Sequence, residues 1–184
     1  MKRVALFLAL TLIALLLTGC SSSVLYSADR TAEIQGLTCY LSRQKNGVFA
    51  GGYVWDGTGT KIVIDVPDEV HGRKLDTLGG FLGRGVPCPF SLVFPESYRG
   101  YTSNPYVTAA EEEIELQVTV RIGPNVKKIN AVDFTSGASY SSVFHSVHIY
   151  TTVSVECDED NPTFYAKDGR LYYRADDTPV KGFS

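Results

Sequence analysis

The residue types best suited to metal binding or nucleophilic catalysis are three histidines and four cysteines, but their spacing favours neither use. His145 and His148 lie three positions apart in a stretch that alternates like a β-strand, so they point to opposite faces and do not converge on one ion. Cys88 lies between Pro87 and Pro89, and no histidine close in sequence is placed to generate a thiolate nucleophile. We therefore expect no metal site, no cofactor and no enzymatic activity.

The acidic run from Asp158 to Asn161 is a candidate calcium loop by composition alone. It lacks the glycine at the sixth position and the bidentate glutamate at the twelfth that an EF-hand loop requires. We interpret it as an acidic turn in front of Asn161-Pro162.

Cys39, Cys88 and Cys157 leave two alternatives open. At most one pair can close within this set, and a Cys39–Cys88 bridge would contribute about 4 kcal/mol in the chain-entropy model. Buried free thiols are the other alternative. The fourth cysteine, Cys20, belongs to a different feature of the chain.

The N-terminal segment has the pattern of an export signal. Lys2 and Arg3 precede a run from Val4 to Leu17 that is apolar or small except for Thr11. A basic start followed by such a run is typical of a signal peptide. The run is too short for a transmembrane helix, which needs about 20 apolar residues.

The sequence Leu17-Thr18-Gly19-Cys20 resembles the lipobox of bacterial lipoproteins. The resemblance implies cleavage after residue 19, acylation of Cys20 and anchoring of the chain to a membrane of the bacterial cell envelope. Several acyl chains, at about 0.8 kcal/mol per buried methylene, make such an anchor durable. We expect a signal peptide over residues 1–19, the lipidated Cys20 with a flexible tether over 20–35, and one domain over 36–184.

The rest of the chain has the composition of a β-rich extracellular domain. Glycine, tyrosine and phenylalanine are plentiful, and β-branched residues recur in short runs. The formal net charge of −3 provides no basic surface for nucleic acid.

Alternation and turn residues predict most of the strands. Strands 37–43 and 48–55 form a hairpin through Asn46-Gly47, and Gly51-Gly52 predicts a bulge in the second strand. The strictest alternation covers residues 114–122, and further runs lie at 62–66, 92–94 and 143–155. Asp168-Gly169 predicts a second hairpin between 164–165 and 171–173. The only helical signal is one short turn over 108–113.

Three of these runs are followed by proline, at Pro67, Pro95 and Pro124, at intervals of 28 and 29 residues. A near-constant interval of this size predicts a solenoid whose units stack in order.

Three segments resemble BspA-like leucine-rich-repeat proteins. The first runs through Gly51-Gly52-Tyr53, Gly57-Thr58-Gly59, Ile62-Val63-Ile64, Val66 to Val70, Gly72 to Leu75 and Leu78-Gly79. The second is VRIGPNVKKI at 120–129, and the third is VSVECDEDNPTFYAKDGRLYY at 153–173. Residues 79–113 depart from the repeat. The resemblance implies a short, irregular, right-handed β-solenoid with hairpins at both ends, used for adhesion or binding without catalytic residues.

Tyr98, Tyr101 and Tyr106 form the candidate ligand-binding loop, in a stretch rich in Gly, Ser, Asn and Pro. Aromatic side chains on such a loop can stack on sugars or anchor a protein partner, although they can equally cover a core. We expect a lipid-anchored surface protein that binds an extracellular protein or glycan. The alternative is a structural component of an envelope protein complex.

Overall fold

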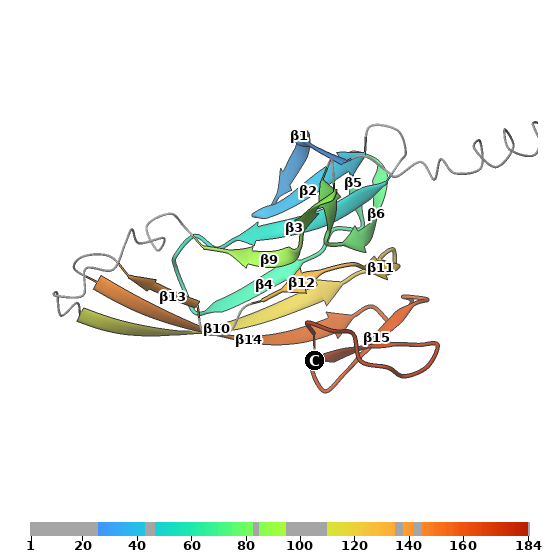
Figure 1. The fold of residues 1–184 in the computed structure, drawn as a ribbon. Coiled ribbons are helices and arrows are strands. Elements are labelled where there is room, and N and C mark those ends of the chain that lie inside the picture. The colour runs from blue at the N-terminus through green and yellow to red at the C-terminus, as the bar shows by residue number, and fades with distance from the viewer. Residues whose placement is uncertain are drawn as a thin grey trace, which may run out of the picture.

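The computed structural model describes residues 26–42, 47–82, 85–94, 110–134, 138–141 and 145–183 (Figure 1). This part of the chain is mainly β with almost no helix, as predicted. None of its helices is long and apolar enough to cross a membrane. The strands are β1 (Tyr26–Ile34), β2 (Leu37–Ser42), β3 (Val48–Val54), β4 (Lys61–Asp65), β5 (Glu69–Val70), β6 (Arg73–Leu78), β7 (Gly80–Leu82), β8 (Val86–Cys88), β9 (Phe90–Val93), β10 (Ala110–Ile122), β11 (Lys128–Ile129), β12 (Val132–Asp133), β13 (Ala138–Ser141), β14 (His145–Cys157), β15 (Phe164–Lys167) and β16 (Arg170–Tyr173).

The N-terminal strand β1 corrects the predicted tether. Tyr26–Ile34 pairs antiparallel with β2, so these residues of the predicted tether belong to the sheet, and the domain begins no later than Tyr26 instead of near Gly36. Gln35 and Gly36, with φ of 49° and 84°, connect the two strands. Positive φ at both central residues is the geometry of a type I′ hairpin turn.

The hairpin between β2 and β3 forms as predicted. Leu37 lies opposite Tyr53, whereas Cys39 lies opposite Ala50, so β3 contains one more residue than β2 over this interval. The extra residue falls at Gly51-Gly52, which confirms the predicted bulge. A Cβ on Gly51 would lie 2.6 Å from the Tyr40 ring, which explains why this bend needs glycine.

The longest strands, β10 and β14, lie parallel and in register in a four-stranded sheet of order β13-β14-β10-β4. The predicted alternation of β10 is confirmed: Leu116, Val118, Val120 and Ile122 are buried, and the residues between them are not. The helical turn predicted over 108–113 is wrong, because Ala110–Glu113 continues the strand. Pairing with β14 along the whole length of β10 outweighs the favourable helical propensity of the glutamates.

Parallel pairs also join the second, larger sheet, in which β11 pairs with β6 and β12 pairs with β9. The even spacing of Pro67, Pro95 and Pro124 does not correspond to the observed pairing of the strands. Val118 of β10 pairs directly with Ile62 of β4, and β9, which contains the intervening Leu92, pairs with β3 and β12 in the other sheet. The apolar run at 90–94 is therefore not a repeat of the runs at 62–66 and 118–122.

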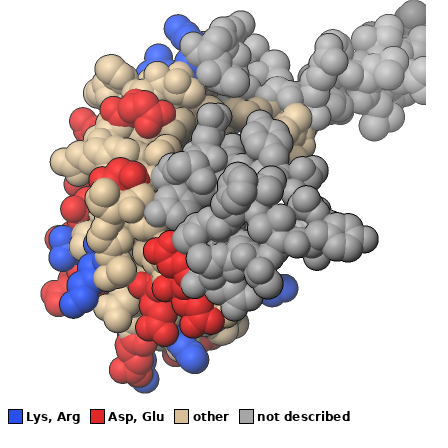
Figure 2. Space-filling model, turned by 90° about the vertical axis from the view of Figure 1, so that its left-hand side faces the viewer, with Lys and Arg blue, Asp and Glu red and all other residues tan. Residues whose placement is uncertain are grey.

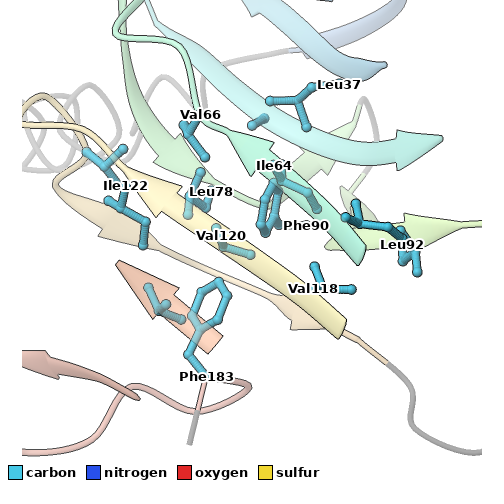
Figure 3. Packing of buried hydrophobic residues seen from close by; sticks show 14 of the residues in the cluster. Leu37, Ile64, Val66, Leu78, Phe90, Leu92, Val118, Val120, Ile122 and Phe183 are labelled. Atoms are coloured by element: carbon cyan, nitrogen blue, oxygen red, sulfur yellow. The ribbon is translucent and has the colours of Figure 1, made fainter. Parts of the chain in front are cut away.

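The core fills the space between the two sheets. Figure 3 shows Ile64, Val118 and Val120 from the smaller sheet facing Leu78 and Phe90 from the larger one. These five side chains are at most 1% exposed. At about 25 cal/mol per Å² of buried apolar surface, this continuous cluster is the main stabilising contribution to the fold.

The C-terminal hairpin of β15 and β16 is confirmed, with Asp168 and Gly169 at φ of 52° and 74° in its turn. Phe183 follows it back into the core and packs against Phe90 and Phe134. The hairpin turn also meets β14, because Val155 donates a backbone hydrogen bond of 2.8 Å to Gly169. The hairpin thus covers part of the outer edge of β14.

Candidate functional site

The feature best placed for binding is the outer surface of the smaller sheet, called the open face below. Its side chains come from alternate positions of three parallel strands and point away from the core. They are Lys61, Val63 and Asp65 from β4; Glu113, Glu115, Gln117, Thr119 and Arg121 from β10; and His148, Tyr150, Thr152, Ser154 and Glu156 from β14.

In-register pairing arranges these side chains in rows across the strands. In the row nearest the carboxyl ends, Arg121 of β10 lies between Asp65 of β4 and Glu156 of β14. Its Nε donates to Glu156 Oε2 at 2.8 Å and its Nη1 donates to Asp65 Oδ1 at 3.3 Å. All three side chains are more than half exposed, so this row stabilises the fold little and remains accessible to a ligand.

The next rows change from charged to polar and apolar groups. The hydroxyls of Thr119 and Ser154 lie 3.2 Å apart. Val63, in the same row, is 45% exposed, and Tyr150 is 46% exposed two rows further toward the strand starts. The open face therefore combines exposed hydroxyls, carboxylates and apolar surface, as ligand-binding surfaces often do.

Two hollows lie at the ends of the open face. The first, of about 560 Å³, is at the start of β4 and is lined in part by Glu112, Glu113, Glu115 and Lys61. The second, of about 340 Å³, is at the strand ends and is lined in part by Asp65, Asp68, Glu156, Asp158 and Arg121. In both hollows carboxylates outnumber cationic groups. Figure 2, which views the side where β10 and β14 begin, shows Asp and Glu side chains gathered there.

The predicted lipidation and ligand-binding residues are not among those that the structure describes. Cys20, Tyr98, Tyr101 and Tyr106 lie outside the described residues, so their predicted roles stay predictions. In the described part of the chain, no three His, Cys, Asp or Glu side chains come together in a way that could hold a metal ion.

The acidic run forms the turn that its sequence predicts. Asp158 Oδ1 accepts the Asp160 N–H at 2.8 Å, and the Asp158 carbonyl accepts the Asn161 N–H at 3.1 Å. One carboxylate of the run is thus used to close the turn.

The three described cysteines are free thiols, so the Cys39–Cys88 bridge does not form. Burial raises the pKa of Cys39 to about 12 and that of Cys157 to about 11. Burial also raises the pKa of Cys88, against the opposing effect of a hydrogen bond with Tyr40. An activated cysteine nucleophile needs the opposite direction, a pKa lowered toward neutral pH.

The buried Cys39 thiol predicts a stability loss in alkali. The thiol ionises near pH 9 in the unfolded chain and near pH 12 in the folded one. Its contribution to the free energy of unfolding is therefore complete below pH 9 and is lost as the pH rises from 9 to 12. We expect urea unfolding between pH 8 and 10.5 to show a shallower decline in Cys39→Ala than in the unsubstituted chain. Equal declines would contradict the assignment of this effect to Cys39.

The open face was not predicted from the sequence, although the polar residues that form part of it are visible there. Residues 115, 117, 119 and 121 are the polar half of the strict alternation, but only strand pairing shows which residues lie beside them.

The sequence matches no family model and no curated protein. A solved structure described as "The Crystal structure of Pneumococcal vaccine antigen PcpA" aligns with 80% of this chain at 13% identity and a TM-score of 0.21. The alignment spans about half of that chain, 55% of its length. A likeness at this TM-score carries no argument about fold or function, and no family is assigned.

Proposed function

We propose that the chain is a lipid-anchored protein of the bacterial cell envelope that binds a protein or glycan ligand, without catalysis, on the open face. The observation that carries the proposal is the in-register display of polar and apolar side chains on three parallel strands. A rigid sheet positions such side chains without the entropic cost of ordering a loop on binding. The acidic hollows favour a ligand with cationic groups.

We further propose that the domain is a short, irregular, right-handed solenoid similar to leucine-rich repeats. The support is the order of the parallel pairs: β4, β10 and β14 stack in one sheet, while β6 with β11 and β9 with β12 stack in the other. The passes through β4 and through β10 each add strands to both sheets, as the units of a solenoid do, and β14 adds a third strand to the smaller sheet. The first pass is preceded by β1, β2 and β3, and the last is followed by the β15–β16 hairpin.

Binding without catalysis fits the chemistry of the open face better than a reaction does. Its carboxylates lie on an exposed surface, where water weakens electrostatic stabilisation of a transition state. The described thiols have raised pKa values.

The binding proposal is tested by charge reversal. Glu113→Lys combined with Glu115→Lys places two cations in the hollow at the start of β4, and Glu69→Lys combined with Asp160→Lys makes the same change at exposed sites that line neither hollow. Cells carrying the full chain are applied to arrays of extracellular proteins and glycans. We expect a ligand whose affinity falls more than about tenfold with the first pair and changes little with the second. Equal binding by both variants, or an absence of ligands together with ester or glycoside hydrolysis, would contradict the proposal.

The anchor has its own test. We expect Cys20→Ser to abolish incorporation of labelled palmitate and to leave the folded domain, measured by membrane fractionation and circular dichroism, intact. Cys88→Ser is the matched control and should still incorporate the label. A misfolded Cys20→Ser chain would show that the division between anchor and domain is wrong.

A further inference from the structure

Among the described strands, β4 ends the smaller sheet and has one unpaired edge. Its even positions face β10: the Thr60 carbonyl accepts the Gln117 N–H at 2.8 Å, and the Val66 N–H donates to the Arg121 carbonyl at 3.0 Å. Backbone groups alternate in direction along a strand, so those of Lys61, Val63 and Asp65 point away from β10. No strand in the described residues pairs with this side of β4.

A hollow of about 400 Å³ lies beside this edge, lined in part by Gln35, Tyr53, Val54, Trp55 and Val63. Val54 is 46% exposed and Val63 is 45% exposed, so two of the large exposed hydrophobic side chains of the described residues border one hollow. Proteins commonly protect an exposed edge strand with a lysine or proline at its centre or with a covering segment. Here the centre of the edge is a valine.

We propose that the β4 edge is a strand-addition site, which binds an extended segment of another polypeptide antiparallel to β4. Backbone hydrogen bonds to Lys61, Val63 and Asp65 would supply affinity, as in other cases of β-augmentation. Cross-strand pairing sets the chemistry of the segment: a cation opposite Asp65, an apolar residue opposite Val63 and a carboxylate opposite Lys61. The segment therefore reads, from its amino end, basic–x–apolar–x–acidic.

A flexible segment suits this edge better than a second folded copy of the chain. Figure 1 shows β3, β2 and β1 on the side of β4 away from β10. An antiparallel copy joined through its own β4 would bring its β1, β2 and β3 toward the same strands. A single extended peptide has no such bulk.

The probe for the test comes from the chain itself, because Lys-Ile-Val-Ile-Asp at 61–65 has the required pattern. A synthetic peptide TKIVIDV, flanked by Gly-Ser, is titrated into the full chain in detergent. The comparison peptide TKIVIKV has a lysine in place of the aspartate that would face Lys61. Binding is followed through the fluorescence of Trp55, the single tryptophan of the chain, and through hydrogen exchange of the Lys61, Val63 and Asp65 amides.

We expect TKIVIDV to slow exchange at these amides and to bind about fivefold more tightly than TKIVIKV. In the Lys61→Asp variant we expect TKIVIKV to bind more tightly than TKIVIDV, because the introduced carboxylate then faces the second lysine of TKIVIKV. Val63→Lys should abolish binding of TKIVIDV, whereas Val86→Lys, at a valine 55% exposed on β8, should leave it unchanged.

Three results would overturn the proposal: no protection of the three amides at saturating peptide, an unchanged preference in Lys61→Asp, or equal losses in Val63→Lys and Val86→Lys. If Val63→Lys fails to fold, the preference of Lys61→Asp still decides, since the Lys61 side chain is exposed and its replacement leaves the core intact. Tighter binding of a charge-exchanged peptide TDIVIKV would show a parallel segment and would also overturn the antiparallel assignment.

Discussion

Replacing Asn161 by Asp is expected to lower the free energy of unfolding by about 3–5 kcal/mol, a large loss for a single side chain. Asn161 is 1% exposed and uses both ends of its amide. Its Nδ2 donates to the carbonyls of Gly123 at 2.8 Å and Val126 at 3.0 Å. Its Oδ1 accepts the N–H groups of Thr163 at 2.9 Å and Phe164 at 2.8 Å.

The substitution is nearly isosteric, so the loss isolates the chemistry of the amide. The aspartate carboxylate can still accept the two N–H groups. Its second oxygen, however, faces the carbonyl oxygens of Gly123 and Val126, which lose their hydrogen-bond donor. Burying the negative charge beside these oxygens is also unfavourable. Urea unfolding followed by circular dichroism measures the difference.

Asn125→Asp is the matched control. Asn125 makes one exposed, long bond of 3.4 Å to the Asp68 carbonyl, so we expect a change within about 0.5 kcal/mol. Similar losses for the two substitutions would show that Asn161 does not hold the turn after β10 to the start of β15.

Replacing Gly79 by Ala is expected to lower the free energy of unfolding by more than about 3 kcal/mol or to prevent folding. Gly79 lies between β6 and β7 at φ of 62°, and a Cβ there would overlap the carbonyl oxygen of Ala131. Its N–H donates to Ala50 at 2.8 Å, and its carbonyl accepts from Asn130 at 3.2 Å. The residue is held on both sides and has little freedom to move aside.

Gly72→Ala separates the backbone strain of a positive φ from the overlap with Ala131. Gly72 has a similar φ of 71°, but a Cβ there meets nothing within 4 Å. We expect it to cost about 1–2 kcal/mol, the strain of a left-handed alanine alone. Thermal unfolding of both variants gives the comparison, and equal losses would mean that the contact with Ala131 is unimportant.

The sequence predicted those parts of the fold that depend on local chemistry. The alternation at 114–122 identified the buried side of β10, and Asp168-Gly169 identified the second hairpin, because side-chain period and turn geometry are properties of neighbouring residues. The strand β1 was missed for the same reason. Its residues are mostly small or polar, and its turn uses Gln35-Gly36 in place of the usual Asn-Gly or Asp-Gly.

Long-range pairing was not predictable from spacing alone. Pro67, Pro95 and Pro124 are evenly spaced, yet the strand before Pro124 pairs with the one before Pro67, and β9 belongs to the other sheet. The open face depends on that pairing: Arg121 comes between Asp65 and Glu156 only because β10 lies between β4 and β14. Asn161 stood out in the sequence only as the end of the acidic run at 158–161 and as part of the resemblance at 153–173, and the four hydrogen bonds of its side chain required the fold.

The early start of β1 limits how far the domain can stand from a membrane. Tyr26 follows Cys20 by six residues, which span at most about 22 Å when fully extended. With the lipid that we propose on Cys20, the start of β1 would stay within that distance of the headgroups. The domain would then remain beside the membrane surface instead of extending from it on a long linker, and a partner would meet it there.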